Sequence, residues 1–254
     1  MNLVIDVGNT MVKLAIFDQD QLLESTSSSS ANALKHVKTL FETYPKLTNG
    51  IISSTAQVPE DLKKELTLEL NLVEFTHQSK VNFKNNYTTP ETLGLDRIAL
   101  VAAASEVYPN ANVLVIDAGS CITYDFLDKT NTYQGGAISP GLQMRFKAMY
   151  TFTEKLPLIT KPWQNTFFIG KSTHDAMQIG VFKSVCYEID GYIEDYLADY
   201  EDLTVVLTGG DYNLLSASIK NSIFATSNFL LKGLNKILQL NSNEYYLPTS
   251  LIHP

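Results

Sequence analysis

Runs of apolar residues with two different spacings alternate along the 254-residue chain. The first run predicts a β-hairpin, because residues 3–5 and 12–17 are apolar and rich in β-branched side chains. Between these stretches lies the polar sequence Asp-Val-Gly-Asn-Thr, which is typical of a tight turn. Residues 2–18 therefore read as a strand, a turn and a returning strand.

A second copy of this hairpin begins at residue 114. Its turn aligns with the first at an offset of 111 residues, which pairs Asp6 with Asp117, Gly8 with Gly119, Asn9 with Ser120 and Thr10 with Cys121. The period is too long for a solenoid and predicts two similar halves. Each turn presents a carboxylate, backbone amides and small polar side chains, a set suited to phosphate and a metal ion. The alternative is that Asp-x-Gly only closes two hairpins.

The remaining apolar periodicity predicts further strands at residues 22–26, 50–55, 70–75, 132–138 and 203–207, and helices at residues 31–44, 60–68, 98–104, 142–150, 173–197 and 229–240. The order of strands and helices occurs twice. It predicts two α/β domains, residues 1–111 and 112–254, with a cleft between them that both turns line. This is the architecture of two ribonuclease H-like domains in the acetate kinase, sugar kinase, heat-shock chaperone and actin superfamily, in which fold alone does not settle function.

Composition narrows the class of protein. Hydrophobic residues make up 44% and charged residues 18% of the chain, as in ordinary globular proteins. The net charge of −8 argues against a broad surface for nucleic acid or anionic membrane. Two cysteines form no disulfide framework and fit a reducing compartment. With no signal peptide and no apolar run of about 18 residues, we expect a cytoplasmic protein.

Residues 170–173, Gly-Lys-Ser-Thr, are similar to the end of a phosphate-binding P-loop. That motif requires a glycine where Asn165 stands, and no strand is predicted before it. A helix cap at Ser172 with Asp175, or at Thr173, explains the stretch instead.

Four stretches together resemble the type III pantothenate kinase family, in the same order along the chain. They are Asp-Val-Gly-Asn-Thr with Lys13 at residues 6–13, Gly-Leu-Asp-Arg at 94–97, Asp-Ala-Gly-Ser at 117–120 and Gly-Gly-Ala-Ile-Ser-Pro-Gly at 135–141. The resemblance implies ATP-dependent phosphorylation of pantothenate to 4′-phosphopantothenate, the first step of coenzyme A biosynthesis. It also implies a homodimer that needs Mg²⁺ and a monovalent cation, K⁺ or NH₄⁺.

The resemblance assigns roles by position. The residues implied to hold ATP phosphates and Mg²⁺ are Asp6, Val7, Gly8, Asn9, Thr10, Met11, Val12 and Lys13, with Asp6 on the metal and Ser120 as a further ATP contact. Asp117 is implied as the ligand of the monovalent cation. The implied pantothenate contacts are Tyr87, Gly94, Leu95, Asp96, Arg97 and Thr173, with Asp96 as the catalytic base. The chain departs from the family where Ser-Cys replaces the usual Thr-Ala at 120–121, although serine keeps the hydroxyl.

Each of these residues also has an ordinary structural interpretation. Asp96 is favoured at a helix N-terminus in any case, Arg97 suits a surface or intrahelical ion pair, and Lys13 suits an outward strand position. Two other functions also remain: a sugar kinase or polyphosphatase-like hydrolase of the superfamily, or a non-enzymatic relative, since the family includes proteins described as accessory factors for transcription. The short chain and the Gly-Leu-Asp-Arg loop argue against the first. Intact Asp6, Lys13, Asp96 and Asp117 favour catalysis over the second.

Overall fold

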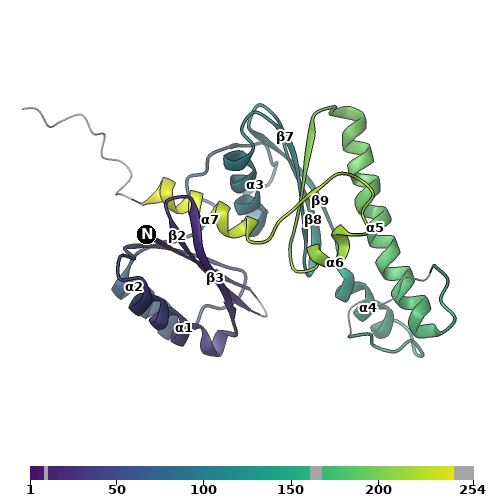
Figure 1. The fold of residues 1–254 in the computed structure, drawn as a ribbon, viewed down its shortest axis with the longest axis horizontal. Helices are drawn as coiled ribbons and strands as arrows, with labels where there is room; N and C mark the ends of the chain where they lie inside the picture. Colours follow the sequence, from purple (N-terminus) through teal and green to yellow (C-terminus); the bar gives the residue numbers. More distant parts are fainter. Residues whose placement is uncertain (9–10, 161–167, 243–254) are drawn as a thin grey trace, which may run out of the picture. The chain divides into compact units, whose positions relative to one another are not determined.

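The computed structural model describes residues 1–8, 11–160 and 168–242. The chain divides into two compact units (Figure 1). Unit 1 comprises Met1–Val107 and the C-terminal segment from Asn228, and unit 2 comprises Tyr108–Ser227. None of the helices within the described ranges combines the length and the hydropathy that a bilayer span requires.

Unit 1 is built on a five-stranded sheet in the order β3-β2-β1-β4-β5. The first three strands are antiparallel, and β4 and β5 continue the sheet in parallel with β1. Its elements are β1 (Asn2–Val7), β2 (Val12–Asp18), β3 (Gln21–Ser28), α1 (Ser30–Thr43), β4 (Asn49–Ser54), α2 (Glu60–Glu69), β5 (Asn71–Glu74), β6 (Lys84–Asn85), a 3₁₀ turn (Pro90–Thr92), α3 (Leu95–Val107) and α7 (Phe229–Asn241).

The core of unit 1 follows from the alternation of side chains along β1. Leu3, Ile5 and Val7 point to one face of the sheet, where α1 and α2 cover them with residues such as Val37 and Leu62. Helix α7 packs against β1, β4 and α3 instead, and Figure 1 shows it on the opposite side of the strands from α1 and α2. Asn235 of α7 also accepts a hydrogen bond from Asn2, at the start of β1, and donates one to the carbonyl oxygen of Gln19, just after β2.

Unit 2 repeats this plan. Its strands run β9-β8-β7-β10-β11, with β7, β8 and β9 antiparallel and β10 and β11 parallel to β7. Its elements are β7 (Asn112–Ala118), β8 (Cys121–Leu127), β9 (Thr132–Pro140), α4 (Leu142–Thr151), α5 (Thr173–Asp199), β10 (Leu203–Thr208), α6 (Tyr212–Ser216) and β11 (Phe224–Ala225). The matching strand order confirms the predicted duplication.

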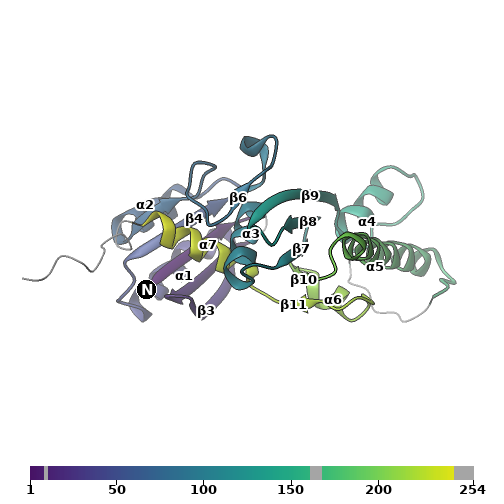
Figure 2. The ribbon, with the colours of Figure 1, turned by 90° about the horizontal axis from the view of Figure 1, so that it is seen from above.

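Helices α4 and α5 supply the core of unit 2. Val185, Ile189 and Ile193 of α5 are fully buried and join one apolar cluster with Leu114 and Ile116 of β7. Figure 2 shows α4 beside α5, and the two helices are in contact. The long helix thus anchors the segment that follows β9.

The predicted helices and strands are present with small shifts at their ends, whereas β6, α6, β11 and the 3₁₀ turn were not expected. The units also differ from the domain division expected at 111/112. Their boundary lies at 107/108, and the last helix, α7, belongs to unit 1. An amphipathic helix reveals that it has an apolar face, but its own sequence does not specify which sheet that face covers.

Candidate active site

The first turn joins β1 to β2 and brings two charged residues together. The antiparallel register places Asp6 directly opposite Lys13, so their side chains share one face of the sheet. Lys13 is exposed, as expected of an outward strand residue, and it also acts electrostatically on Asp6. Asn9 and Thr10, the predicted tip of this turn, lie outside the described residues.

The other residues of the turn have mainly structural contacts. Val7 and Val12 face each other in the register and are completely buried, so a ligand would meet only their backbone. The amide of Gly8 donates to the carbonyl of Met11 at 3.0 Å and closes the turn. The Gly8 amide is therefore committed to the hairpin, and a phosphate would depend on other donors of the turn.

Asp6 has a strongly perturbed carboxyl group. Burial raises its pKa to about 6, Lys13 counteracts part of that shift, and the nearby charge of Asp96 raises the pKa further. A cation bound at Asp6 would offset the repulsion that the charge of Asp96 exerts on the ionised Asp6 carboxylate. Mg²⁺ is usually held by one or two carboxylates together with substrate phosphates and water. Among the described residues, no group of three or more His, Cys, Asp or Glu side chains lies close enough together to hold a metal ion by itself.

The first turn of α3 contains two other residues of unit 1 that the sequence analysis assigned to the active site, Asp96 and Arg97. The Oδ1 of Asp96 accepts a hydrogen bond from the amide of Arg97 at 2.8 Å. Arg97 is only 4% exposed, which makes the surface ion pair interpretation wrong. Its guanidinium carbon lies 5.7 Å from the centre of the Tyr87 ring, a cation–π distance. Unit 1 therefore brings together Tyr87 and Arg97, two of the residues expected to contact pantothenate.

The segment that enters α3 is anchored by a residue that the sequence did not single out. His77 Nε2 lies 2.8 Å from the carbonyl oxygen of Leu93. Leu93 is buried, while Gly94 is exposed and Leu95 is half-buried. His77 thus fixes the backbone immediately before the predicted pantothenate contacts. An isolated histidine in a polar loop carries no signal for such a contact.

The second turn joins β7 to β8 and is one residue shorter than the first. In the second hairpin, residues 119–121 lie between the last paired positions of the strands. In the first hairpin, residues 8–11 lie between them. The constant offset of 111 residues therefore fails beyond the glycine. Asp117 lies opposite Thr123, the structural counterpart of Lys13. Gly119 donates to Cys121 at 2.9 Å, and Ser120 is exposed.

The end of β10 closes against this second turn. The parallel register pairs Thr208 with Asp117. Gly209 follows with a φ of +100°, and a side chain there would overlap the Asp117 carboxylate and the Ala118 carbonyl. Asp211 donates its amide to the Ala118 carbonyl at 2.9 Å, and burial raises the pKa of its carboxyl. The sequence analysis did not single out Asp211, although the ends of the parallel strands β7 and β10 meet at one edge of the sheet.

Thr173 is the first residue of α5 and is exposed. The preceding Ser172 is the N-cap, and its Oγ accepts a hydrogen bond from the amide of Asp175 at 3.1 Å. This confirms the helix-cap interpretation of the Gly-Lys-Ser-Thr run. Asn165, which was used to reject a P-loop, lies outside the described residues.

Comparison with known sequences gives a consistent picture. A family model described as type III pantothenate kinase matches residues 2–195. A protein of that name from Christiangramia forsetii is 46% identical, over 96% of this chain and 100% of its own length. Another, from Flavobacterium johnsoniae, is 41% identical over 94% of this chain and 98% of its own.

Solved structures share the fold at low identity. One described as a conserved putative Baf family transcriptional activator from Campylobacter jejuni has a TM-score of 0.56 and 23% identity, and the match covers 94% of this chain and 98% of the other. Component A of the (R)-2-hydroxyglutaryl-CoA dehydratase of Acidaminococcus fermentans has a TM-score of 0.52 and 15% identity, covering 93% and 95%. With the matching sheet orders of the two units, these likenesses confirm the expected fold class and nothing finer.

Proposed function

The chain belongs to the type III pantothenate kinase family, and we propose how its residues carry out the reaction of that family. The enzyme phosphorylates pantothenate in coenzyme A biosynthesis, with ATP as the phosphoryl donor. The observation that carries the assignment of residues is the cluster of Asp6, Lys13 and Asp96 in unit 1. Phosphoryl transfer needs phosphates held in line, their charge neutralised and the acceptor hydroxyl oriented.

Asp6 and Lys13 are assigned to the phosphates. Asp6 would hold Mg²⁺, directly or through water, and the ion would supply positive charge that neutralises the phosphate oxygens. Lys13, opposite Asp6 in the strand register, adds a second positive charge on the same face. The raised pKa of Asp6 supports this role, because a buried carboxylate beside another carboxylate gains stability when a cation binds.

Asp96 is assigned as the catalytic base. It orients the pantothenate hydroxyl and then accepts its proton as that oxygen attacks the γ-phosphorus. The bond from the γ-phosphorus to the β,γ-bridging oxygen breaks at the same time and ADP leaves. The Asp96 carboxylate is held in one orientation by the Arg97 amide. The buried guanidinium of Arg97, beside the Tyr87 ring, binds the pantothenate carboxylate, since arginine pairs with carboxylates through two parallel hydrogen bonds. Gly94, Leu95 and Thr173 are assigned as further contacts of pantothenate.

The second turn is assigned to the rest of the nucleotide and to the monovalent cation. Ser120 contacts ATP through its exposed hydroxyl. Asp117 would ligate K⁺ or NH₄⁺, which is supported by the position of its carboxylate and the Ala118 carbonyl beside Gly209. Carbonyl and carboxylate oxygens are suitable ligands for such hard cations.

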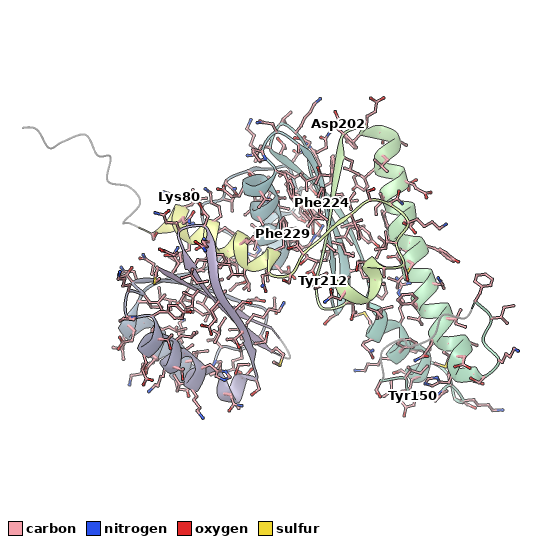
Figure 3. The ribbon with its side chains drawn as sticks, viewed as in Figure 1. Lys80, Tyr150, Asp202, Tyr212, Phe224 and Phe229 are labelled. Atoms are coloured by element: carbon pink, nitrogen blue, oxygen red, sulfur yellow. The ribbon has the colours of Figure 1, made fainter. Side chains whose placement is uncertain are left out.

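The enzyme is further proposed to be a homodimer. Support comes from exposed apolar side chains that unit 2 carries, notably Met144, Tyr150, Phe152, Leu158 and Tyr187. Figure 3 shows Tyr150 on α4. Apolar surface of this kind is characteristic of protein–protein contacts. Light scattering coupled to size-exclusion chromatography is expected to give the mass of two chains, and a monomeric mass with full activity would refute the dimer.

The proposed location is the cytoplasm, with neither nucleic acid nor membrane as a partner. The free thiols of Cys121 and Cys186 fit a reducing compartment, and the net charge of −8 disfavours polyanion binding. Cell fractionation and a filter-binding assay with DNA and RNA test these two statements.

One experiment tests the function directly. Purified protein is incubated with ATP, Mg²⁺, K⁺ and pantothenate, and the products are analysed by mass spectrometry for 4′-phosphopantothenate. Matched reactions omit pantothenate or use the Asp96→Asn variant. Product in the complete reaction and its near absence in both controls support the proposal. A folded, ATP-binding protein that makes no phosphopantothenate would refute it.

A further inference from the structure

Arg145, on the first turns of α4, holds the segment between β9 and α4 by several contacts. Its Nε donates to the carbonyl oxygen of Pro140 at 2.8 Å, and its Nη2 donates to Ser139 Oγ at 2.9 Å. Nη2 also pairs with the carboxylate of Glu188 on α5, while Nη1 lies 3.4 Å from Ser184 Oγ. One guanidinium therefore joins the β9–α4 segment to the long helix.

Glu188 is itself fixed from the side of the sheet. The hydroxyl of Tyr124 on β8 donates to Glu188 Oε1 at 2.9 Å. Tyr124 is completely buried, and its ring stacks on that of Tyr192 with 4.1 Å between ring centres. Burial and the Glu188 charge raise the Tyr124 pKa well above its usual value, so the hydroxyl remains a donor. Arg145, Glu188 and Tyr124 form a continuous chain of contacts from α4 to β8.

The segment that Arg145 holds rests on the second turn. Pro140 pairs with Cys121 and Ser139 with Ile122 in the strand register. The amide of Gly141 donates to the Ser120 carbonyl at 3.1 Å. A side chain at position 141 would collide with the carbonyl oxygens of Gly119 and Ser120. Backbone lies directly on backbone here, so a displacement of the segment also displaces Ser120.

An ordinary surface ion pair would not have these properties. The side chains of Arg145 and Glu188 are 19% and 22% exposed, whereas those of the Lys38–Glu65 pair in unit 1 are 54% and 27% exposed. Exposed pairs contribute little and order nothing around them. A mostly buried arginine that donates to four partners fixes the geometry of each of them.

We propose that Arg145, braced by Glu188 and Tyr124, is a positioning residue for ATP. It acts through the backbone of residues 139–141 and holds Ser120 where the nucleotide binds. The inference rests on the proposed role of the second turn in ATP binding. Arg145 itself touches neither substrate. Its loss is therefore expected to weaken ATP binding and to leave pantothenate binding unchanged.

The first test replaces Arg145 by methionine, which keeps an unbranched apolar stem and removes the guanidinium. Calorimetric titration of the full chain with Mg·ATP, and steady-state kinetics, are expected to show Kd and KM for ATP about 10- to 100-fold higher. The KM for pantothenate is expected to stay within about twofold of wild type. The matched control, Lys38→Met, breaks the exposed ion pair of unit 1 and is expected to change neither constant.

Milder variants separate positioning from loss of folding. Tyr124→Phe keeps the ring stacked on Tyr192 and removes the bond to Glu188, so a rise in KM for ATP of about three- to tenfold is expected. The same change in an Arg145→Met background is expected to add nothing, because both residues act through one chain of contacts. Arg145→Lys retains the charge pair with Glu188 but not the forked contacts to the segment, and is expected to fall between wild type and Arg145→Met.

Each outcome decides the inference. Wild-type ATP affinity in Arg145→Met overturns it, and so does an equal rise in the KM of both substrates, which would mean general destabilisation. If Arg145→Met does not fold, Tyr124→Phe and Arg145→Lys decide by the same split between ATP and pantothenate. If the wild-type chain binds ATP but makes no phosphopantothenate, the proposed function fails while the ATP titration still decides the role of Arg145. A wild-type chain that binds no ATP overturns both.

Discussion

The turns of the two hairpins share a backbone plan, yet they differ in the residue that faces the carboxylate. Asp6 faces Lys13 across the first hairpin, whereas Asp117 faces Thr123 across the second. In each turn the glycine amide closes the hairpin, by donating to Met11 in the first and to Cys121 in the second. The duplicated strands thus form the same framework in both turns. The residue opposite the carboxylate, Lys13 or Thr123, makes the first site strongly charged and the second more neutral.

The surroundings of the two carboxylates differ in the same way. The negative charge of Asp96, in the first turn of α3, raises the pKa of Asp6. Asp117 has the backbone of Gly209 packed against it instead. A pair of carboxylates beside a lysine suits a divalent ion on phosphate, while one carboxylate beside carbonyl oxygens suits a monovalent ion. The proposed assignment of different cations to two copies of one motif rests on this difference between the turns.

The largest effect is expected from replacing Asp96, the proposed catalytic base. Asp96→Asn keeps the shape of the side chain and removes its negative charge, so kcat is expected to fall by about 10²- to 10⁴-fold. Affinity for ATP, measured by calorimetry, should change little, because the phosphates are held by the turn. Retention of more than about a tenth of the wild-type kcat would leave Asp96 as a helix-terminal acid only.

A second large effect is expected at Asp6. If this carboxylate holds Mg²⁺, Asp6→Asn should lower kcat/KM for ATP by about 10²-fold, with partial recovery at high Mg²⁺. Turnover near wild type, with an unchanged thermal melt, would contradict the metal role.

The same substitution is expected to raise stability in metal-free buffer. Because the pKa of Asp6 is raised from 3.8 to about 6 on folding, the folded chain holds this proton more tightly than the unfolded chain. The free-energy cost of ionising Asp6 in the folded chain is small below pH 4, grows as the pH rises towards 6 and is complete above it. Urea unfolding at pH 8 should therefore show Asp6→Asn more stable by on the order of 2 kcal/mol, with little difference at pH 4. Equal stability at both values would mean that the carboxyl is not perturbed.

At the second turn, the expected effect is on cation dependence. Turnover should rise about tenfold when K⁺ or NH₄⁺ replaces Na⁺, and Asp117→Ala should abolish that response. Asp6→Asn, by contrast, should keep the ratio between K⁺ and Na⁺ while losing turnover in both. Equal rates in all three salts for the wild-type enzyme would remove the assigned difference between the turns.

The smallest effect sharpens the contrast directly. Lys13→Thr gives the first turn the residue found opposite Asp117. Since Lys13 lowers the pKa of Asp6, its removal should raise that pKa further. Carbon NMR of the Asp side chains in the metal-free protein measures the change, with Lys38→Met as a control distant in sequence. An unchanged pKa would mean that the register pairing has no electrostatic consequence.

Sequence periodicity determined most of the framework. Strand and helix positions, the order of elements and their duplication follow from local patterns of apolar and polar residues, because secondary structure and side-chain face depend on near neighbours. The location of Asp6, Lys13, Asp96 and Asp117 at turns and a helix start is equally local. These features were readable without coordinates, and the structure confirms them.

Only the tertiary structure decided which elements meet. Helix α7 joins unit 1 because Asn235 accepts a hydrogen bond from Asn2 and donates one to the Gln19 carbonyl, contacts that span most of the chain length. The perturbed pKa of Asp6, the burial of Arg97 and the contacts of Arg145 likewise depend on residues far apart in sequence. Periodicity shows that a face will be buried, but the partner of that face and the charges around it are set by the folded chain as a whole.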